Sequence, residues 1–324
     1  MKRFYIGIDT SNYTTSCALF ETEECRFYSN VKRLLGVAEG ERGLRQSDAV
    51  FAHIKNLPSV TAEALADIEP EALGAVGVSA TPRDSEGSYM PCFLSGEAAA
   101  STLANAVKKP LHRFSHQAGH VMAAVWSSGS PDLLSREFIA FHVSGGTTEL
   151  LYVRPRAGVG FDIEKLGGTL DLNAGQCIDR VGVAMGLDFP CGPKLEELAL
   201  ANTQLLSKPK LSVKGCECNL SGVENKAAKL LADGKSREFV AAYVLDFIAR
   251  TLIELTKNAL DGNRLPVLYA GGVMSNSIIK DMISRRGFDA RFAEPKFSSD
   301  NAAGCALLCA AAEEGWEFWT NKAI

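Results

Sequence analysis

Two of the protein's five histidines, His116 and His120, are four positions apart in a segment whose composition is typical of a helix. On a helix this spacing places both imidazoles on one face, within reach of a single metal ion. A carboxylate such as Asp300 would complete a set of two histidines and one acid, which leaves coordination positions open for a substrate and suits Fe(II), Mn(II) or Zn(II). Spacing alone cannot bring Asp300 to the histidines, and such pairs also arise by chance.

Three short segments of small or hydroxyl-bearing residues each follow a stretch that the apolar pattern predicts to be a buried strand. They are Asp9-Thr10-Ser11, Ser144-Gly145-Gly146 and Gly271-Gly272. Without bulky side chains, backbone N–H groups in such loops can approach a phosphate or acyl-phosphate oxygen. One loop of this kind could be an ordinary hairpin turn, but three at strand ends favour a nucleotide site of the type found in actin-like and sugar-kinase-like folds.

Two aspartates near these loops have both a functional and a plain interpretation. Asp9 could hold a metal ion or a water, or it could accept hydrogen bonds from its own turn. Asp179 follows a helix start near Asp171, where N-terminal amides favour an anion. Asp179 could therefore receive ribose hydroxyls, or it could be a solvated residue on the helix surface.

The elements that must position these residues occur twice along the chain. Residues 4–8 and 17–20 are predicted to be paired strands, and residues 138–143 and 150–153 repeat the pattern. Between and after them, helical spacing predicts helices that include one beginning at His116 with Ser115 as its N-cap, a long one capped by Ser236, and a final one over residues 301–317.

These patterns predict an α/β fold with an internal duplication. We expect two subdomains, residues 1–115 and 116–299, with a C-terminal helix at about 300–324 packing back on the first.

Composition limits the function classes. The chain has 34 Lys and Arg against 38 Asp and Glu, for a net charge of −4, which argues against binding nucleic acid by bulk charge alone. Nine cysteines without regular spacing favour reduced thiols and a cytoplasmic protein. We expect no signal peptide and no membrane span, because the longest small or apolar run, residues 302–312, falls short of the roughly 20 residues that a span requires.

Short motifs in a fixed order resemble one known family, the threonylcarbamoyl-adenosine tRNA-modification transferases, TsaD and its archaeal and eukaryotic relatives, once labelled M22 glycoproteases. The matching segments extend over nearly the whole chain: Gly7–Ser11, His116–His120, Val143–Gly146, Gly175–Asp179, Pro190–Pro193, Leu220–Gly222, Ala270–Asn276 and Ser299–Asn301.

The resemblance implies an actin/sugar-kinase/Hsp70-like (ASKHA) duplicated two-domain fold with a central nucleotide cleft. It also implies one divalent metal ion held by His116, His120 and Asp300, with Fe(II) favoured over Zn(II) or Mn(II). By the same carry-over, an adenylate-type nucleotide would lie against a set of residues in the second half: His142, Val143, Ser144, Gly145, Gly146, Asp179, Gly192, Gly271, Gly272 and Asn276.

The function implied is metal-dependent transfer of a threonylcarbamoyl group from threonylcarbamoyl-AMP to N6 of adenosine in tRNA. Asp9 is the candidate base, or a water-mediated metal contact. The expected partners are threonylcarbamoyl-AMP or an ATP-like nucleotide, and tRNA reached through TsaB-like and TsaE-like subunits, without any membrane.

The chain departs from the family pattern at several acids and one histidine. Thr14, Leu172 and Gln176 replace acidic residues, Thr147 replaces a histidine, and Cys191 replaces a glycine. Two alternatives therefore stay open: a diverged nucleotide- and metal-binding paralogue that acts as an assembly or regulatory subunit, and a carbamoyltransferase for a small molecule. A metallopeptidase is disfavoured, because no H-E-x-x-H motif supplies the general base.

Overall fold

The computed structural model describes residues 2–11, 13–36, 44–298 and 301–322. Contacts divide the chain into two compact units. The first comprises Met1–Arg136, Arg154–Ile163 and Phe297–Ile324, and the second comprises Glu137–Val153 and Glu164–Lys296.

A five-stranded sheet forms the centre of the first unit, in the order β3-β2-β1-β4-β5. The strands are β1 (Phe4–Asp9), β2 (Thr14–Glu21), β3 (Arg26–Leu34), β4 (Leu73–Thr81) and β5 (Leu111–Ser115). β2 pairs antiparallel with β1 and β3, whereas β4 is parallel to both β1 and β5. All six residues of β1 are buried, as its central place in the sheet requires.

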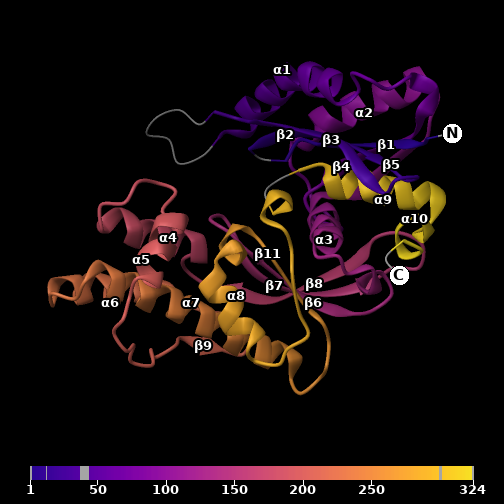
Figure 1. The fold of residues 1–324 in the computed structure, drawn as a ribbon. Helices are drawn as coiled ribbons and strands as arrows, with labels where there is room; N and C mark the ends of the chain where they lie inside the picture. Colours follow the sequence, from indigo (N-terminus) through magenta and orange to yellow (C-terminus); the bar gives the residue numbers. More distant parts are fainter. Residues whose placement is uncertain (1, 12, 37–43, 299–300, 323–324) are drawn as a thin grey trace. The chain divides into compact units, whose positions relative to one another are not determined.

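Helices cover both faces of this sheet (Figure 1). They are α1 (Gln46–Ala64) and α2 (Phe93–Val107) on one face and α9 (Ala303–Glu314) on the other. Because side chains alternate along a strand, Ile6 and Ile8 join the core under α1 and α2, while Gly7 faces α9. A Cβ on Gly7 would lie 2.5 Å from both the Ala302 carbonyl oxygen and the Ala306 nitrogen. The glycine thus lets α9 approach the sheet backbone closely.

The helix that carries the two histidines, α3 (His116–Ser127), begins where sequence predicts. The Ser115 side chain accepts a hydrogen bond from the Ala118 N–H, which confirms the predicted N-cap. α3 packs against α9, so residues 116–136 belong to the first unit, whereas the predicted boundary followed residue 115. The C-terminal α9 packs on the first sheet. Short helices complete this unit: η1 (Pro70–Ala72), η2 (Pro131–Leu134) and α10 (Glu317–Thr320). The short η4 (Pro295–Phe297) spans the sequence boundary at which the second unit ends and the first resumes.

A seven-stranded sheet, in the order β12-β11-β6-β7-β8-β10-β9, forms the second unit. Its strands are β6 (Phe138–Val143), β7 (Thr148–Pro155), β8 (Phe161–Thr169), β9 (Val213–Lys214), β10 (Glu217–Cys218), β11 (Val267–Ala270) and β12 (Ala290–Phe292). The end of β7 (residues 154–155) and the start of β8 (residues 161–163) are assigned to the first unit. The run β8-β7-β6-β11-β12 repeats the neighbour order of β3-β2-β1-β4-β5. The hairpins β1–β2 and β6–β7 are antiparallel. The pairs β1–β4 and β4–β5 are parallel, and so are the corresponding pairs β6–β11 and β11–β12. The predicted duplication is therefore confirmed.

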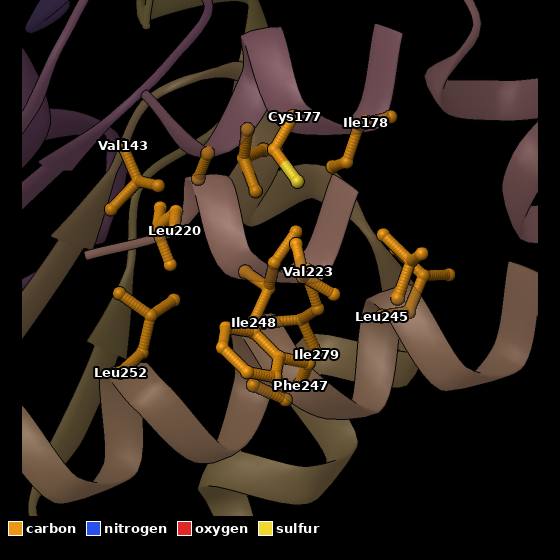
Figure 2. Packing of buried hydrophobic residues seen from close by; sticks show 14 of the residues in the cluster. Val143, Cys177, Ile178, Leu220, Val223, Leu245, Phe247, Ile248, Leu252 and Ile279 are labelled. Carbon is orange, nitrogen blue, oxygen red and sulfur yellow. The ribbon is translucent and has the colours of Figure 1, made fainter. Parts of the chain in front are cut away.

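The helices of the second unit pack around the longest of them, α7. They are α4 (Ala174–Ala184), α5 (Gly192–Leu200), α6 (Ser221–Ala232), α7 (Arg237–Leu260) and α8 (Ser277–Ser284). The Ser236 side chain caps α7 by accepting from the Phe239 N–H, as predicted. Figure 2 shows Val223 of α6, Ile248 of α7 and Ile279 of α8 gathered in one apolar cluster.

Within the described ranges, no helix combines the length and apolar character that a membrane span needs.

Candidate functional site

The two histidines lie side by side at the start of α3. Their ring centroids are 4.2 Å apart and the ring planes are inclined by 75°. His116 Nδ1 lies 2.8 Å from Oδ2 of Asp9, at the end of β1, although the two residues are 107 positions apart. The fold therefore brings the first strand's carboxylate to the first histidine.

Asp9 is held firmly in this position. Its side chain is buried, with 1% of the residue exposed, and Oδ1 accepts hydrogen bonds from the Ser11 hydroxyl and from the Ser11 backbone N–H at 2.9 Å. Burial by itself raises the pKa of the Asp9 carboxyl, but the His116 imidazole and the hydrogen bonds from His116 and Ser11 hold that pKa below its ordinary value. Asp9 is therefore an anion whose two oxygens both accept hydrogen bonds.

A close helix crossing occurs at Gly119, which lies between the two histidines in sequence. Gly119 of α3 and Gly304 of α9 meet there, and a Cβ on Gly304 would lie 1.8 Å from the Gly119 carbonyl oxygen. Gly304 is four positions after Asp300 in sequence. Asp300 itself lies outside the described residues, so its predicted role as third ligand stays a prediction.

The donor set fits a divalent metal ion in part. Two adjacent imidazoles are suitable ligands for Fe(II), Mn(II) or Zn(II), and a carboxylate bonded to the far nitrogen of a ligating histidine is a common supporting arrangement. Across the part of the chain that the structure describes, no group of three His, Cys, Asp or Glu residues forms a complete metal-binding cluster. His116 and His120 could therefore hold an ion with ligands from outside that part or from a substrate.

In the second unit, the turn between β6 and β7 is closed on itself. The Ser144 hydroxyl accepts from the backbone N–H groups of Gly146 at 3.3 Å and Thr147 at 3.1 Å, and the Ser144 N–H donates to the Thr147 carbonyl at 2.7 Å. A Cβ built on Gly145 or Gly146 meets no described atom within 4 Å. The turn is thus a compact loop with an open outer side.

Two further backbone segments converge on this turn. The Gly175 N–H of α4 donates to the Ser144 carbonyl at 3.1 Å, and a Cβ on Gly175 would lie 2.6 Å from the Gly145 nitrogen. Gly271, just after β11, has φ +105°, and its Cβ would lie 2.1 Å from the Val143 carbonyl oxygen. Only glycine fits at these two positions, so backbone and a helix N-terminus surround the loop. Because the N–H groups of Gly146, Thr147 and Gly175 already donate within the protein, the arrangement offers an anion such as a phosphate the open outer side of the loop and the dipole of α4.

Other predicted ligand residues of the second unit have structural hydrogen bonds. Asp179 Oδ1 accepts from the Cys191 N–H at 2.8 Å and so fixes the turn before Gly192, the first residue of α5. Asn276 Oδ1 accepts from the Ile279 N–H at 3.0 Å and caps α8. His142 is half-buried in β6, in register with Ala270 of β11. The predicted adenylate contacts of these residues stay predictions.

Several departures from the family pattern have a local structural explanation. Leu172 is buried in the apolar core of the second unit, where an acid would be desolvated. Gln176 Oε1 accepts from the Asn173 N–H at 3.2 Å, and the pair forms a capping box at the start of α4. The N-x-x-Q spacing was the sequence signal for this box. No local signal indicated the contacts of Gly119 with Gly304 or of Asp9 with His116.

Comparison with known proteins gives one family over most of the chain. The family model described as TsaD, tRNA N6-adenosine threonylcarbamoyltransferase, matches residues 39–307. A probable bifunctional tRNA threonylcarbamoyladenosine biosynthesis protein of Thermoplasma volcanium is 29% identical over 285 residues, which are 87% of this chain and 50% of that protein. The chain spans about half the length of the curated relatives it matches.

Solved structures at low sequence identity share the fold. The Acidaminococcus fermentans (R)-2-hydroxyglutaryl-CoA dehydratase component A superposes with a TM-score of 0.54 at 13% identity, covering 95% of this chain and 97% of that one. A ROK family glucokinase from Streptomyces griseus, in complex with glucose and AMPPNP, gives 0.53 at 12% identity, covering 96% and 100%. The predicted ASKHA fold class is confirmed.

Proposed function

We propose, because the chain belongs to the TsaD family of tRNA N6-adenosine threonylcarbamoyltransferases, that it acts in tRNA modification by transferring a threonylcarbamoyl group from threonylcarbamoyl-AMP to N6 of an adenosine. The observation that carries this proposal is the family match over residues 39–307, which includes His116, His120 and the loop of residues 144–147 but not Asp9.

We place the adenylate of threonylcarbamoyl-AMP at the loop of residues 144–147. The close approaches of Gly175 and Gly271 support this placement, because they leave backbone and the N-terminus of α4 beside the loop. The dipole at the N-terminus of α4 favours the phosphate of the leaving group, while the N–H groups of Gly146, Thr147 and Gly175 hold the loop in shape through bonds within the protein. Gly192 and Asn276 begin neighbouring helices and are the further proposed contacts.

We place one divalent metal ion, Fe(II) by preference, at His116, His120 and Asp300. When bound, such an ion would polarise the carbamoyl carbonyl or neutralise phosphate charge. Asp9 is a poor candidate for the general base in this arrangement, because its two oxygens already accept hydrogen bonds from Ser11 and His116. We therefore assign Asp9 to the support of His116 and not to the attacking amine.

The acceptor is tRNA bound with the help of TsaB-like and TsaE-like partner subunits in the cytoplasm. A net charge of −4 supports the need for partners, since phosphate binding depends on clustered Lys and Arg. The second candidate function is a nucleotide- and metal-binding paralogue that regulates or assembles such a complex. It is favoured by the burial of Leu172 in the core and by the capping role of Gln176, where the family has acids.

One assay separates the two candidate functions. Purified protein is mixed with threonylcarbamoyl-AMP and unmodified tRNA, with and without a complete set of bacterial partner proteins, and modified adenosine is measured by mass spectrometry. The transferase proposal predicts partner-dependent modification that His116→Ala removes. Adenylate binding without any modification would favour the paralogue, and an absence of adenylate binding would defeat both.

Metal content tests the proposed ion site directly. The purified chain should hold about one transition metal ion, and His116→Ala, His120→Ala and Asp300→Ala should each lose most of it. His112→Ala is the matched control, because His112 lies on β5 and its Nε2 pairs with Oε1 of Glu313 at a distance of 2.7 Å. If all four variants held as much metal as the wild type, the proposed site would be disproved.

A further inference from the structure

We propose that Asp9 is a positioning residue that acts through His116, by fixing the imidazole in the tautomer that presents the Nε2 lone pair to a metal ion. This inference rests on the proposed function only for the identity of the ligand. The hydrogen-bond geometry that carries it is independent of any bound ion.

The chemistry of the contact determines where the proton lies. Asp9 Oδ2 is 2.8 Å from His116 Nδ1, which is a hydrogen-bond distance. An ionised carboxylate can only accept, so Nδ1 must donate and must carry the proton. In the neutral ring the lone pair is then on Nε2.

Asp9 cannot easily turn away from this contact. Its other oxygen, Oδ1, accepts from the backbone N–H of Ser11 at 2.9 Å, and that donor belongs to the turn that follows β1. The residue is 1% exposed, so water does not compete for the carboxylate. The ring of Phe93 lies 5.9 Å from the ring of His116 and limits its space on another side. The carboxylate and the imidazole therefore form a pre-arranged pair.

Asp9→Asn should reverse the tautomer without changing the size of the side chain. The Ser11 backbone N–H still requires an acceptor, so the amide oxygen takes the place of Oδ1. The amide nitrogen then occupies the place of Oδ2 and donates to Nδ1. Since Nδ1 must now accept, the proton of the neutral ring moves to Nε2, which loses the lone pair that a metal ion needs.

The experiment uses the full chain in metal-free form. Two-bond nitrogen-to-carbon-proton NMR correlations of ¹⁵N-histidine-labelled protein, at mildly alkaline pH, report which ring nitrogen of His116 carries the proton. His116→Gln identifies the resonance. Zn²⁺ affinity is then measured by competition with a chelator. Asp246→Asn is the matched control, because Asp246 is a buried aspartate paired with Arg250 at 2.7 Å in the second unit.

We expect the Nδ1–H form in the wild type and the Nε2–H form in Asp9→Asn, with Zn²⁺ affinity about 10- to 100-fold lower in that variant. The control should match the wild type in both measurements. A wild-type His116 protonated on Nε2 would overturn the proposal whether or not the variant folds, as would an Asp9→Asn protein with unchanged tautomer and affinity. If the wild type binds no Zn²⁺, the proposed metal site fails, and the tautomer still decides the role of Asp9.

Discussion

Replacing Gly304 with alanine tests the helix crossing beside the histidines. A Cβ at this position would lie 1.8 Å from the Gly119 carbonyl oxygen, 2.6 Å from the carbonyl carbon and 2.9 Å from the Gly119 Cα. All three atoms belong to the backbone of α3, so no side-chain rotation can relieve the overlap. We expect α3 and α9 to separate locally in Gly304→Ala.

Two opposing terms set the size of the effect. Alanine gains at most about 1 kcal/mol over glycine in a helix. Overpacking of a close contact typically costs about 1–3 kcal/mol, and a backbone clash falls at the upper end because neither helix can adjust alone. We therefore expect the free energy of unfolding to fall by about 1–2 kcal/mol.

Equilibrium urea unfolding followed by circular dichroism measures this change against two controls. In Gly119→Ala, at the same crossing, the nearest described atom to the new Cβ is the Cys305 nitrogen at 3.8 Å, which is an ordinary contact. Gly222 is the second residue of the 12-residue α6, just as Gly304 is the second residue of the 12-residue α9. In Gly222→Ala the new Cβ meets no described atom within 4 Å. Both controls should be as stable as the wild type or more stable. Equal stability of Gly304→Ala and the controls would refute the close crossing.

Three further predictions concern the loop, a buried histidine and a helix cap. Gly145→Val should fold normally but lose the rise in melting temperature that AMP produces. Gly175→Ala should be destabilised even without AMP, because its Cβ would lie 2.6 Å from the Gly145 nitrogen. If AMP raised the melting temperature of both variants as it does that of the wild type, the nucleotide would bind elsewhere. Burial lowers the pKa of His53 from 6.5 to about 4. Between pH 6.5 and pH 4, His53 therefore binds a proton in the unfolded chain but not in the folded one. The free energy of unfolding should then fall by roughly 3 kcal/mol as the pH drops from 6.5 to 4, and His53→Gln should lose that part of the pH dependence in urea titrations; identical pH profiles would contradict this. Gln176→Glu keeps an acceptor in the capping box and adds a charge that the N-terminus of α4 favours, so its melting temperature should be unchanged or slightly higher; a clear fall would rule out the capping role.

The parts of the fold that depend on nearby residues could be predicted from sequence. The N-caps at Ser115 and Ser236 and the paired strands of both halves follow from local patterns. Local patterns did not predict that residues 116–136 belong to the first unit. That assignment depends on packing between α3 and α9, which are far apart in sequence. A glycine such as Gly304 carries no sequence signal of the partner backbone that makes it necessary.

The candidate site shows the same division between local and distant information. Gly145 and Gly271 were identified from small residues at strand ends, where close backbone approach is expected. The hydrogen bond between Asp9 and His116 joins residues 107 positions apart. From sequence, both residues were candidates for the site, but their contact could not be predicted. From sequence, Leu172 was interpreted as the replacement of a family acid. The structure places it in the apolar core, which explains the leucine and could not be inferred from one sequence.

The duplicated hairpin explains how one architecture can serve two kinds of binding. β1 and β6 are both six residues long, and each is followed by four residues, 10–13 and 144–147, before its partner strand begins at a threonine. The last strand position is Asp9 in the first copy and Val143 in the second, and the following loops carry Ser11 and Gly145 at equivalent places. The first copy therefore directs a carboxylate to a histidine, which suits a cation site, whereas the second exposes a loop of small residues beside a helix N-terminus, which suits an anion. The two copies differ at both of these aligned positions, with Asp9 against Val143 and Ser11 against Gly145, and the differences accompany the opposite preferences.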